Sequence, residues 1–126
     1  MINYDTMLAG LKDLVDNPTP RVPVALCLDV SGSMAGTPIR ELNAGAAQYL
    51  TEMQEDDLTR YSVETALVSF ASDAACVTDF EMAERIQLPQ MEAGGITCMG
   101  EGIELALDLL EKRKASYKAT GVDYYQ

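Results

Sequence analysis

The chain has 126 residues, a hydrophobic content of 48% and a formal charge of −11. This length fits one domain with a single hydrophobic core. The sequence contains no histidine, which excludes a Ser-His-Asp triad, a histidine general base and a zinc site with histidine ligands. Nucleic acid is not expected as a partner, because binding it requires a basic face, whereas an acidic surface favours solubility or cationic partners.

The three cysteines, Cys27, Cys76 and Cys98, are far apart in the sequence and form no C-x-x-C pair. Neither a zinc ribbon nor a thioredoxin-like redox site is therefore predicted, and free thiols fit a reducing compartment. The first residues lack the basic and apolar blocks of a signal peptide, and no apolar run approaches membrane-spanning length. The sequence thus predicts a cytoplasmic protein without membrane contact.

Residues 1–20 are predicted to form an N-terminal helix and a proline-rich linker, ahead of a domain over residues 21–126. Apolar residues within 4–16 recur at helical spacing and form one stripe. Pro18 and Pro20 end this helix, since a proline disfavours helix in the residue before it. Two interpretations remain open: a helix that packs on the main body, and a frayed terminal arm.

An almost wholly apolar run over residues 22–28 predicts a buried strand. A helix is predicted over 38–54, with Thr37 as its N-cap and Pro38 as its first residue. Residues 61–70 predict a second strand. Strand, helix and strand form a βαβ unit, which places the two strands in parallel.

The link after the second strand is too short for another crossover, so residues 74–80 are predicted to turn back as an antiparallel strand at the sheet edge. Pro89 argues against a central strand in 81–93. A last helix is predicted to begin near residues 98–100, with basic residues of 111–114 in its last turns. The apolar stripe predicted for this helix comprises Ile103, Ala106, Leu107 and Leu110.

Three oxygen-bearing side chains, Asp29, Ser31 and Ser33, occupy alternate positions where the first strand should end. Ligands bind outside the carboxyl ends of strands in open α/β sheets, and alternate residues can converge on one side of the loop. Hard oxygen donors suit Mg²⁺ or Mn²⁺ better than a soft metal. A purely local interpretation also remains open, in which the hydroxyls satisfy loop backbone groups and Thr97 only caps the last helix.

The motif Asp29-x-Ser31-x-Ser33 after an apolar strand, followed far downstream by Gly94-Gly95-Ile96-Thr97 at a helix start, resembles the von Willebrand factor A (vWA) family. Residues 17–24 look like the bacterial TerY-like branch of that family, which is linked to tellurium resistance. The resemblance covers roughly residues 17–113. It implies a Rossmann-like three-layer α/β/α sandwich, with a mostly parallel sheet and one antiparallel edge strand.

The resemblance also implies a function, that of a protein-interaction module with a metal-ion-dependent adhesion site (MIDAS) rather than an enzyme. Mg²⁺, or Mn²⁺ or Ca²⁺, would be held by Asp29, Ser31, Ser33 and Thr97. The hydroxyls would bind directly, and Asp29 would bind directly or through a water. A partner protein would then offer an Asp or Glu carboxylate to the ion. Members of the TerY-like branch often occur in bacterial stress-response systems.

The sequence departs from the family after the last predicted helix. A complete vWA domain continues with a strand ending in Thr-Asp-Gly, which supplies a late MIDAS aspartate, and with further helices and strands. None of these precedes Gln126, so the domain is expected to be C-terminally incomplete and to bind metal weakly. Strand 22–28 would then present an open apolar edge, which a second copy or another chain could cover.

Two alternative functions remain. A truncated vWA fragment could act as an assembly or oligomerisation element through the open edge of strand 22–28. An Mg²⁺-dependent phosphatase-like enzyme is the other alternative, because Asp29 at a strand end resembles the nucleophile of aspartyl-phosphate phosphatases. Those enzymes need a second acid two residues later, where this chain has Ser31. The sequence therefore favours a binding module over an enzyme.

Overall fold

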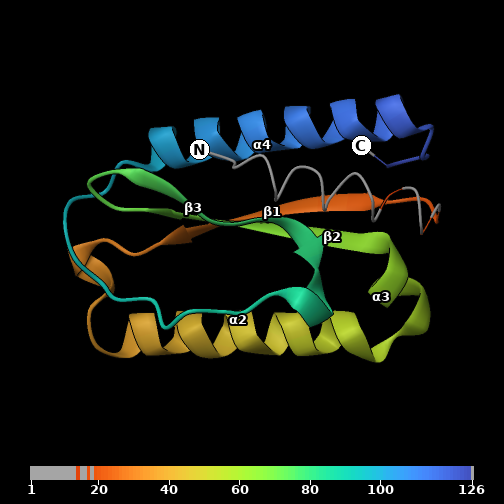
Figure 1. The fold of residues 1–126 in the computed structure, drawn as a ribbon. Coiled ribbons are helices and arrows are strands. Elements are labelled where there is room, and N and C mark those ends of the chain that lie inside the picture. Colours follow the sequence, from red (N-terminus) through yellow and green to blue (C-terminus); the bar gives the residue numbers. More distant parts are fainter. Residues whose placement is uncertain (1–13, 15–16, 18, 126) are drawn as a thin grey trace.

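A computed structural model describes Leu14, Asn17 and residues 19–125 of the chain. Two helices cover opposite faces of a three-stranded sheet, α2 on one face and α4 on the other (Figure 1). The predicted α/β/α sandwich is therefore confirmed. The elements in chain order are β1 (Val22–Asp29), η1 (Gly32–Met34), α2 (Thr37–Glu55), α3 (Asp57–Ser62), β2 (Val63–Phe70), β3 (Ala74–Met82), η2 (Ala83–Arg85) and α4 (Met99–Thr120).

The helix predicted over 4–16 lies outside the described residues except for Leu14, which is helical and fully buried. Leu14 packs in a cluster with Tyr117 and Val122. No helix in the described part of the chain is both long and apolar enough to cross a membrane.

The sheet has the strand order β1-β2-β3. β1 and β2 are parallel, with Val22 opposite Val63 and Asp29 opposite Phe70. β3 is antiparallel to β2 and forms one edge, so the predicted βαβ unit and antiparallel edge strand are both confirmed. Because β1 and β2 run in the same direction, the loops that follow them meet at one end of the sheet.

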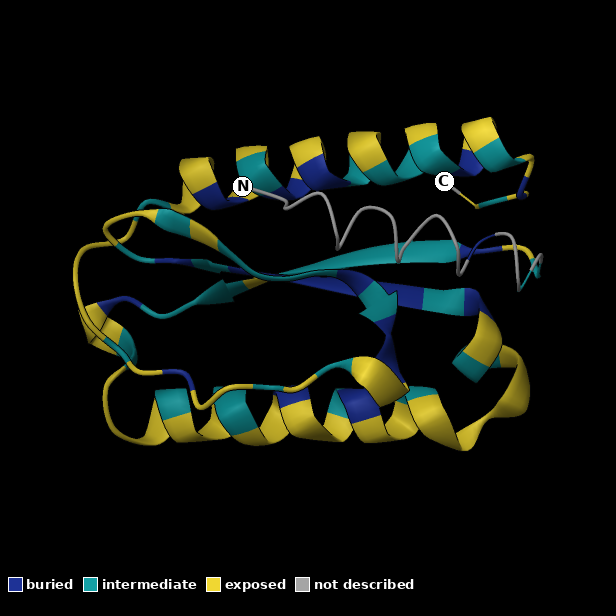
Figure 2. Ribbon diagram, in the orientation of Figure 1, coloured by how far each residue is buried: buried dark blue, intermediate teal, exposed yellow. Residues whose placement is uncertain are grey.

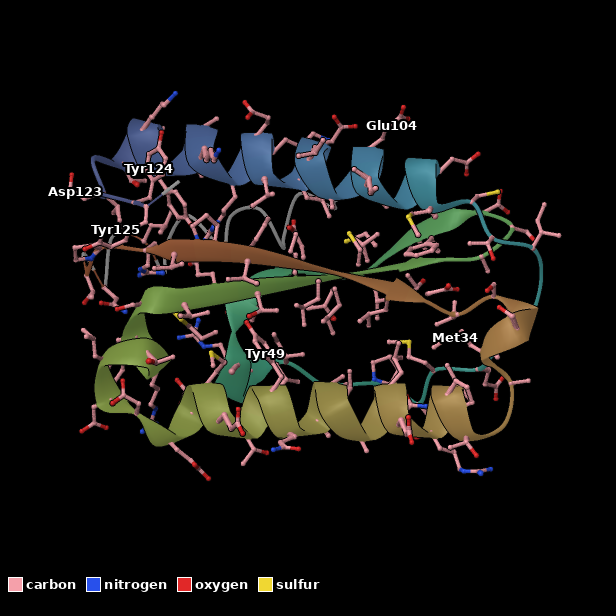
Figure 3. The ribbon with its side chains drawn as sticks, turned by 180° about the vertical axis from the view of Figure 1, so that it is seen from behind. Met34, Tyr49, Glu104, Asp123, Tyr124 and Tyr125 are labelled. Atoms are coloured by element: carbon pink, nitrogen blue, oxygen red, sulfur yellow. The ribbon has the colours of Figure 1, made fainter. Side chains whose placement is uncertain are left out.

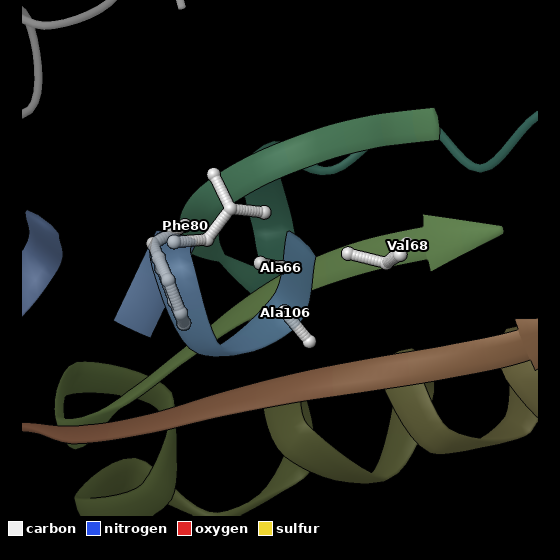
Figure 4. Close-up of a cluster of buried hydrophobic side chains, with 5 residues drawn as sticks. Ala66, Val68, Phe80 and Ala106 are labelled. Carbon is white, nitrogen blue, oxygen red and sulfur yellow. The ribbon is translucent and has the colours of Figure 1, made fainter. Parts of the chain in front are cut away.

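One cluster of buried hydrophobic residues lies between the sheet and α4. Ala66 and Val68 of the central strand pack there with Phe80 of β3 and with Ala106 and Leu109 of α4 (Figure 4). On the other face, Tyr49 extends from α2 toward the sheet, and its hydroxyl lies 2.9 Å from Thr65 Oγ1 (Figure 3). Since helices cover both faces, β2 is buried along most of its length, as its nearly continuous apolar run predicts (Figure 2).

The apolar stripe predicted for α4 is wrong in part. Ala106 is buried and Leu110 is half-buried, but Ile103 and Leu107 are 46% and 56% exposed. The buried line of the helix comprises Gly102, Ala106, Leu109 and Tyr117. Gly102 sets this orientation, because a Cβ at that position would lie 2.8 Å from Phe70 Cδ1, so only glycine lets the helix approach the strand so closely.

Boundaries also differ from the prediction. α4 continues to Thr120, so the basic residues of 111–114 lie within the helix rather than in its last turns. Gly36, with φ 85°, is the N-cap of α2, and the predicted cap Thr37 is instead the first helical residue. Tyr61 and Ser62 belong to the short helix α3 rather than to the second strand. Asp56 is the N-cap of α3, and its carboxylate accepts a hydrogen bond from Thr59 N at 2.9 Å.

A buried cluster of charged groups lies at the end of the sheet where β2 begins. The Glu64 carboxylate, 1% exposed, accepts from Arg21 Nη1 at 2.5 Å, from Arg113 Nε and Nη2 at 2.6 Å each, and from the Tyr117 hydroxyl. Burial and the Glu64 carboxylate raise the pKa of Tyr117 far above its usual range, so this hydroxyl remains a donor. The cluster joins the residue before β1 to β2 and α4, and nothing in the sequence analysis predicted it.

The segment after α4 pairs with the chain just before β1. Gly121 ends the helix in the left-handed conformation at φ 73°. Arg21 N then donates to Asp123 O at 2.8 Å, Tyr125 N donates to Arg21 O at 2.9 Å, and Tyr124 forms a parallel bridge with Arg21. In the described part of the chain, β1 itself has no strand on its outer side, so the predicted open edge begins after Arg21.

Replacing Glu64 with glutamine should strongly destabilise the fold. Glu64→Gln removes the negative charge that the buried Arg21 and Arg113 guanidinium groups share, so we expect a loss of about 3–5 kcal/mol in the free energy of unfolding, measured in urea. Glu84→Gln is the matched control, because it breaks the exposed pair with Arg60 and should cost less than about 1 kcal/mol. Equal losses in the two variants would contradict a stabilising role for the buried cluster.

Two glycine variants test the close approach of α4 to β2. Gly102→Ala forces the helix away from Phe70, and we expect it to lose about 1–3 kcal/mol of stability. Gly45→Ala, in an open position of α2, should be neutral or stabilising by up to about 1 kcal/mol, because alanine favours a helix over glycine. Thermal and urea unfolding of both variants give the comparison, and an unchanged stability for Gly102→Ala would show that the helix orientation does not depend on this contact.

Candidate metal site

The side chains of Asp29, Ser31 and Ser33 lie together where β1 ends and the chain turns into η1. Asp29 Oδ1 accepts two hydrogen bonds from Ser31, one from its N–H at 2.9 Å and one from its Oγ at 2.6 Å. The two serine hydroxyl oxygens are 3.2 Å apart. The alternate spacing of these three residues thus brings their oxygens into one group.

The surroundings of the three side chains differ. The hydrogen bonds from the side chain and the backbone of Ser31 lower the pKa of Asp29, so its carboxylate is ionised at neutral pH. Ser31 is 1% exposed and has its hydroxyl directed at Asp29, whereas Ser33 is exposed to solvent. The group therefore presents one fixed negative charge and one accessible hydroxyl.

A second segment, residues 94–98, forms backbone hydrogen bonds with the loop that follows β1. Gly94 N donates to Val30 O, and Gly32 N donates to Gly95 O, each at 2.8 Å. Thr97 lies two residues after Gly95 and is exposed. Cys98, not Thr97, is the N-cap of α4, so the interpretation of Thr97 as the helix cap is wrong.

The loop after β2 also contacts the 94–98 segment. Ser72 Oγ accepts from Ile96 N at 3.2 Å, and Ala71 O accepts from Cys98 N at 2.8 Å, so the residues on both sides of Thr97 are held. The sequence analysis missed Ser72; its place at the carboxyl end of the second strand was the signal that could have identified it.

Two glycines make this close contact of loops possible. A Cβ on Gly32 would lie 3.3 Å from Gly95 O, at the limit of ordinary contact. Gly95 has φ 82°, and a Cβ there would lie 2.4 Å from Ser72 Oγ. A side chain at position 95 would therefore displace the segment that carries Thr97.

The oxygen atoms at this end of the sheet suit a small, hard cation. The four predicted ligands, Asp29, Ser31, Ser33 and Thr97, comprise one carboxylate and three hydroxyls, a donor set typical of Mg²⁺ or Mn²⁺. Adjacent ligands of an octahedral Mg²⁺ lie about 3.0 Å apart. The 3.2 Å between Ser31 Oγ and Ser33 Oγ is close to that spacing. The shorter contact from Asp29 to Ser31 suits a carboxylate that orients a ligand.

The same hydrogen bonds also stabilise the turn without an ion, so the local interpretation of the serines stays open. No group of three or more Cys, Asp or Glu side chains suited to a metal occurs within the described residues. A cation site in this part of the chain would therefore depend on hydroxyl ligands.

Several solved structures share this fold. The vWF domain of the type V pili tip protein Mfa5 from Porphyromonas gingivalis is 21% identical, with a TM-score of 0.61 over 74% of this chain and 33% of its own. The PilB minor pilin from Streptococcus sanguinis is 16% identical, with a TM-score of 0.60 over 74% of this chain and 27% of its own. At these identities the likeness supports the fold alone.

Sequence comparison identifies the family. A UPF0353 protein from Mycolicibacterium paratuberculosis is 30% identical over 113 residues, which are 87% of this chain and 33% of that protein. The chain thus spans about a third of the length of this curated relative. The profile of the von Willebrand factor type A domain matches residues 24–122, which is most of the chain. The chain therefore belongs to the von Willebrand factor type A domain family.

Proposed function

We propose that this chain is a divalent-cation-dependent protein-interaction module. Domains of its family are general protein-interaction modules. The observation that carries the cation dependence is the grouping of Asp29, Ser31 and Ser33 through hydrogen bonds of 2.6–3.2 Å at the end of β1. This grouping supports a MIDAS-type site.

Each residue has a distinct role in the proposed site. Ser31, Ser33 and Thr97 would offer hydroxyl oxygens to Mg²⁺, Mn²⁺ or Ca²⁺. Asp29 holds the Ser31 hydroxyl in place and supplies the negative charge. When bound, the ion supplies an electrophilic centre that accepts an Asp or Glu carboxylate of a partner protein. A donor set with one carboxylate binds cations weakly, because carboxylate charge sets affinity.

Two local features favour binding over catalysis. The residue two positions after Asp29 is Ser31, whose hydroxyl donates to Asp29 and cannot act as the acid that a phosphatase of this kind requires. The 94–98 segment contributes an exposed Thr97 but no general base. We therefore propose a binding role rather than a phosphatase-like one.

The second candidate function is assembly through the outer edge of β1. Arg21 pairs with the tail through both its N–H and its C=O, so the alternate residues Pro23, Ala25 and Cys27 direct their backbone groups to the same open side. Pro23 has no N–H to offer, which weakens this edge as a template. Light scattering at micromolar concentration tests the idea, because a strict monomer would contradict pairing between copies.

A cytoplasmic location and a role in a tellurium-resistance-like stress response remain part of this proposal. They depend on the resemblance of residues 17–24 to the TerY-like branch and on the free thiols of the chain. The weak-binding expectation also remains, since it follows from the single carboxylate in the proposed donor set.

Removing the Asp29 charge should abolish cation binding. We expect weak but saturable Mn²⁺ binding by the natural chain in titration calorimetry, and none by Asp29→Asn, which keeps an oxygen acceptor for Ser31. Asp73→Asn is the matched control, because it removes an exposed carboxylate from the loop after β2 at the same end of the sheet. The same Mn²⁺ affinity in the natural chain and in Asp29→Asn would contradict the proposed site.

A backbone variant tests whether the 94–98 segment delivers Thr97 to the site. Gly95→Ala places a methyl group against Ser72 Oγ at a positive φ, so the segment should shift and Mn²⁺ affinity should fall at least as far as in Thr97→Ala. Gly94→Ala is the control, since a Cβ there meets nothing within 4 Å. Unchanged Mn²⁺ affinity in both Gly95→Ala and Thr97→Ala would exclude Thr97 from the ligand set.

A further inference from the structure

Large apolar side chains are exposed at one end of α4 and in the loop before it. Four of them follow one another along the chain and form what we call the apolar ridge: Ile96, Met99, Ile103 and Leu107. Their exposed fractions are 71%, 53%, 46% and 56%. Contiguous exposed apolar surface of this kind marks interaction sites more often than single exposed residues do.

The ridge has a defined geometry. Met99, Ile103 and Leu107 are spaced by four residues, so they lie on one side of α4 over a length of about 12 Å. Ile96 lies in the loop before the helix, three residues before Met99 and next to Thr97 in the sequence. The ridge therefore starts at the candidate metal site and runs along the helix away from it.

The helix around the ridge is acidic. From Met99 to Glu111 the chain contains no Lys or Arg, and Glu104 extends from the outer side of α4, away from the sheet (Figure 3). The exposed carboxylates of this stretch belong to Glu101, Glu104, Asp108 and Glu111. A surface that combines apolar side chains with negative charge complements an apolar surface with Lys or Arg at its margin.

We propose that the apolar ridge is the docking surface for an amphipathic helix of a partner protein. The apolar stripe of that helix packs along Met99, Ile103 and Leu107, and its Lys or Arg side chains meet the carboxylates of α4. An Asp or Glu near one end of the helix passes Ile96 and reaches the candidate metal site. This last contact rests on the proposed function; the packing on the ridge does not.

Synthetic peptides test the proposal on the full chain. The probe is a 14-residue amphipathic helix with leucines at four-residue spacing, flanking lysines and one aspartate near an end, prepared with the aspartate at either end. Binding is measured by fluorescence anisotropy in Mn²⁺ and in EDTA. Comparison peptides replace the leucines by serine, the lysines by glutamate or the aspartate by asparagine, and one further peptide has the sequence of residues 1–13.

The variants separate the ridge from the metal site. Ile103→Ser with Leu107→Ser should weaken peptide binding at least tenfold in Mn²⁺ and in EDTA, while Mn²⁺ affinity stays unchanged. Leu58→Ser, an equally polar change at a residue 72% exposed outside the ridge, should leave peptide affinity as it is. Loss of Mn²⁺ binding in Asp29→Asn should remove only the part of the affinity that depends on the peptide aspartate.

The proposal is overturned if the ridge variant and the natural chain bind the leucine peptide equally, or if the leucine and serine peptides bind equally. Tighter binding of the glutamate peptide than of the lysine peptide would also overturn it. Preferential binding of the 1–13 peptide would make the chain's own N-terminus the occupant instead of a partner helix. Light scattering that shows self-association lost in the ridge variant would assign the ridge to a second copy. If the chain binds no Mn²⁺ but the leucine peptide still binds in EDTA, the proposed function fails and the ridge stands.

Discussion

The parallel pairing of β1 with β2 is the constraint on which the candidate site depends. Because Asp29 lies opposite Phe70, the loops that follow the two strands emerge side by side at one end of the sheet. Each loop then gives the 94–98 segment a backbone or side-chain partner, through Val30 O and Ser72 Oγ. The exposed Thr97 is thereby placed at the same end as Asp29, although 68 positions separate them in the chain.

At the opposite end of the sheet, buried ion pairs and hydrogen bonds to Glu64, rather than contacts between loops, connect the elements. Glu64 accepts hydrogen bonds from Arg21, just before β1, and from Arg113 and Tyr117 in the second half of α4. Tyr124 lies on the Tyr117 ring, with centroids 5.3 Å apart, so the tail is fastened to the same cluster. Met34 and the tail tyrosines lie at opposite ends of the molecule (Figure 3). α4 is thus held at its start by the hydrogen bond from Cys98 N and in its second half by the contacts of Arg113 and Tyr117 with Glu64.

The orientation of α4 links packing to the surface that the helix presents. Gly102, Ala106 and Leu109 face the sheet, so the helix approaches β2 closely, and Met99, Ile103 and Leu107 are turned outward. Ile103 and Leu107, two residues of the stripe that the sequence predicts as core, are therefore exposed. The absence of a side chain at position 102 therefore affects both sides of α4. It allows the close packing on the sheet side, and it sets which residues face outward on the proposed partner surface.

From the sequence alone, the strands, the βαβ order, the antiparallel edge strand and the Asp29-Ser31-Ser33 motif could be predicted, because apolar periodicity and motif spacing are local properties. The tertiary structure decided the rest. Which face of α4 is buried depends on the contact of Gly102 with Phe70, and Ser72 and the cluster around Glu64 join residues 24 to 53 positions apart. No local pattern encodes such contacts, since they arise only when the folded sheet brings distant segments together.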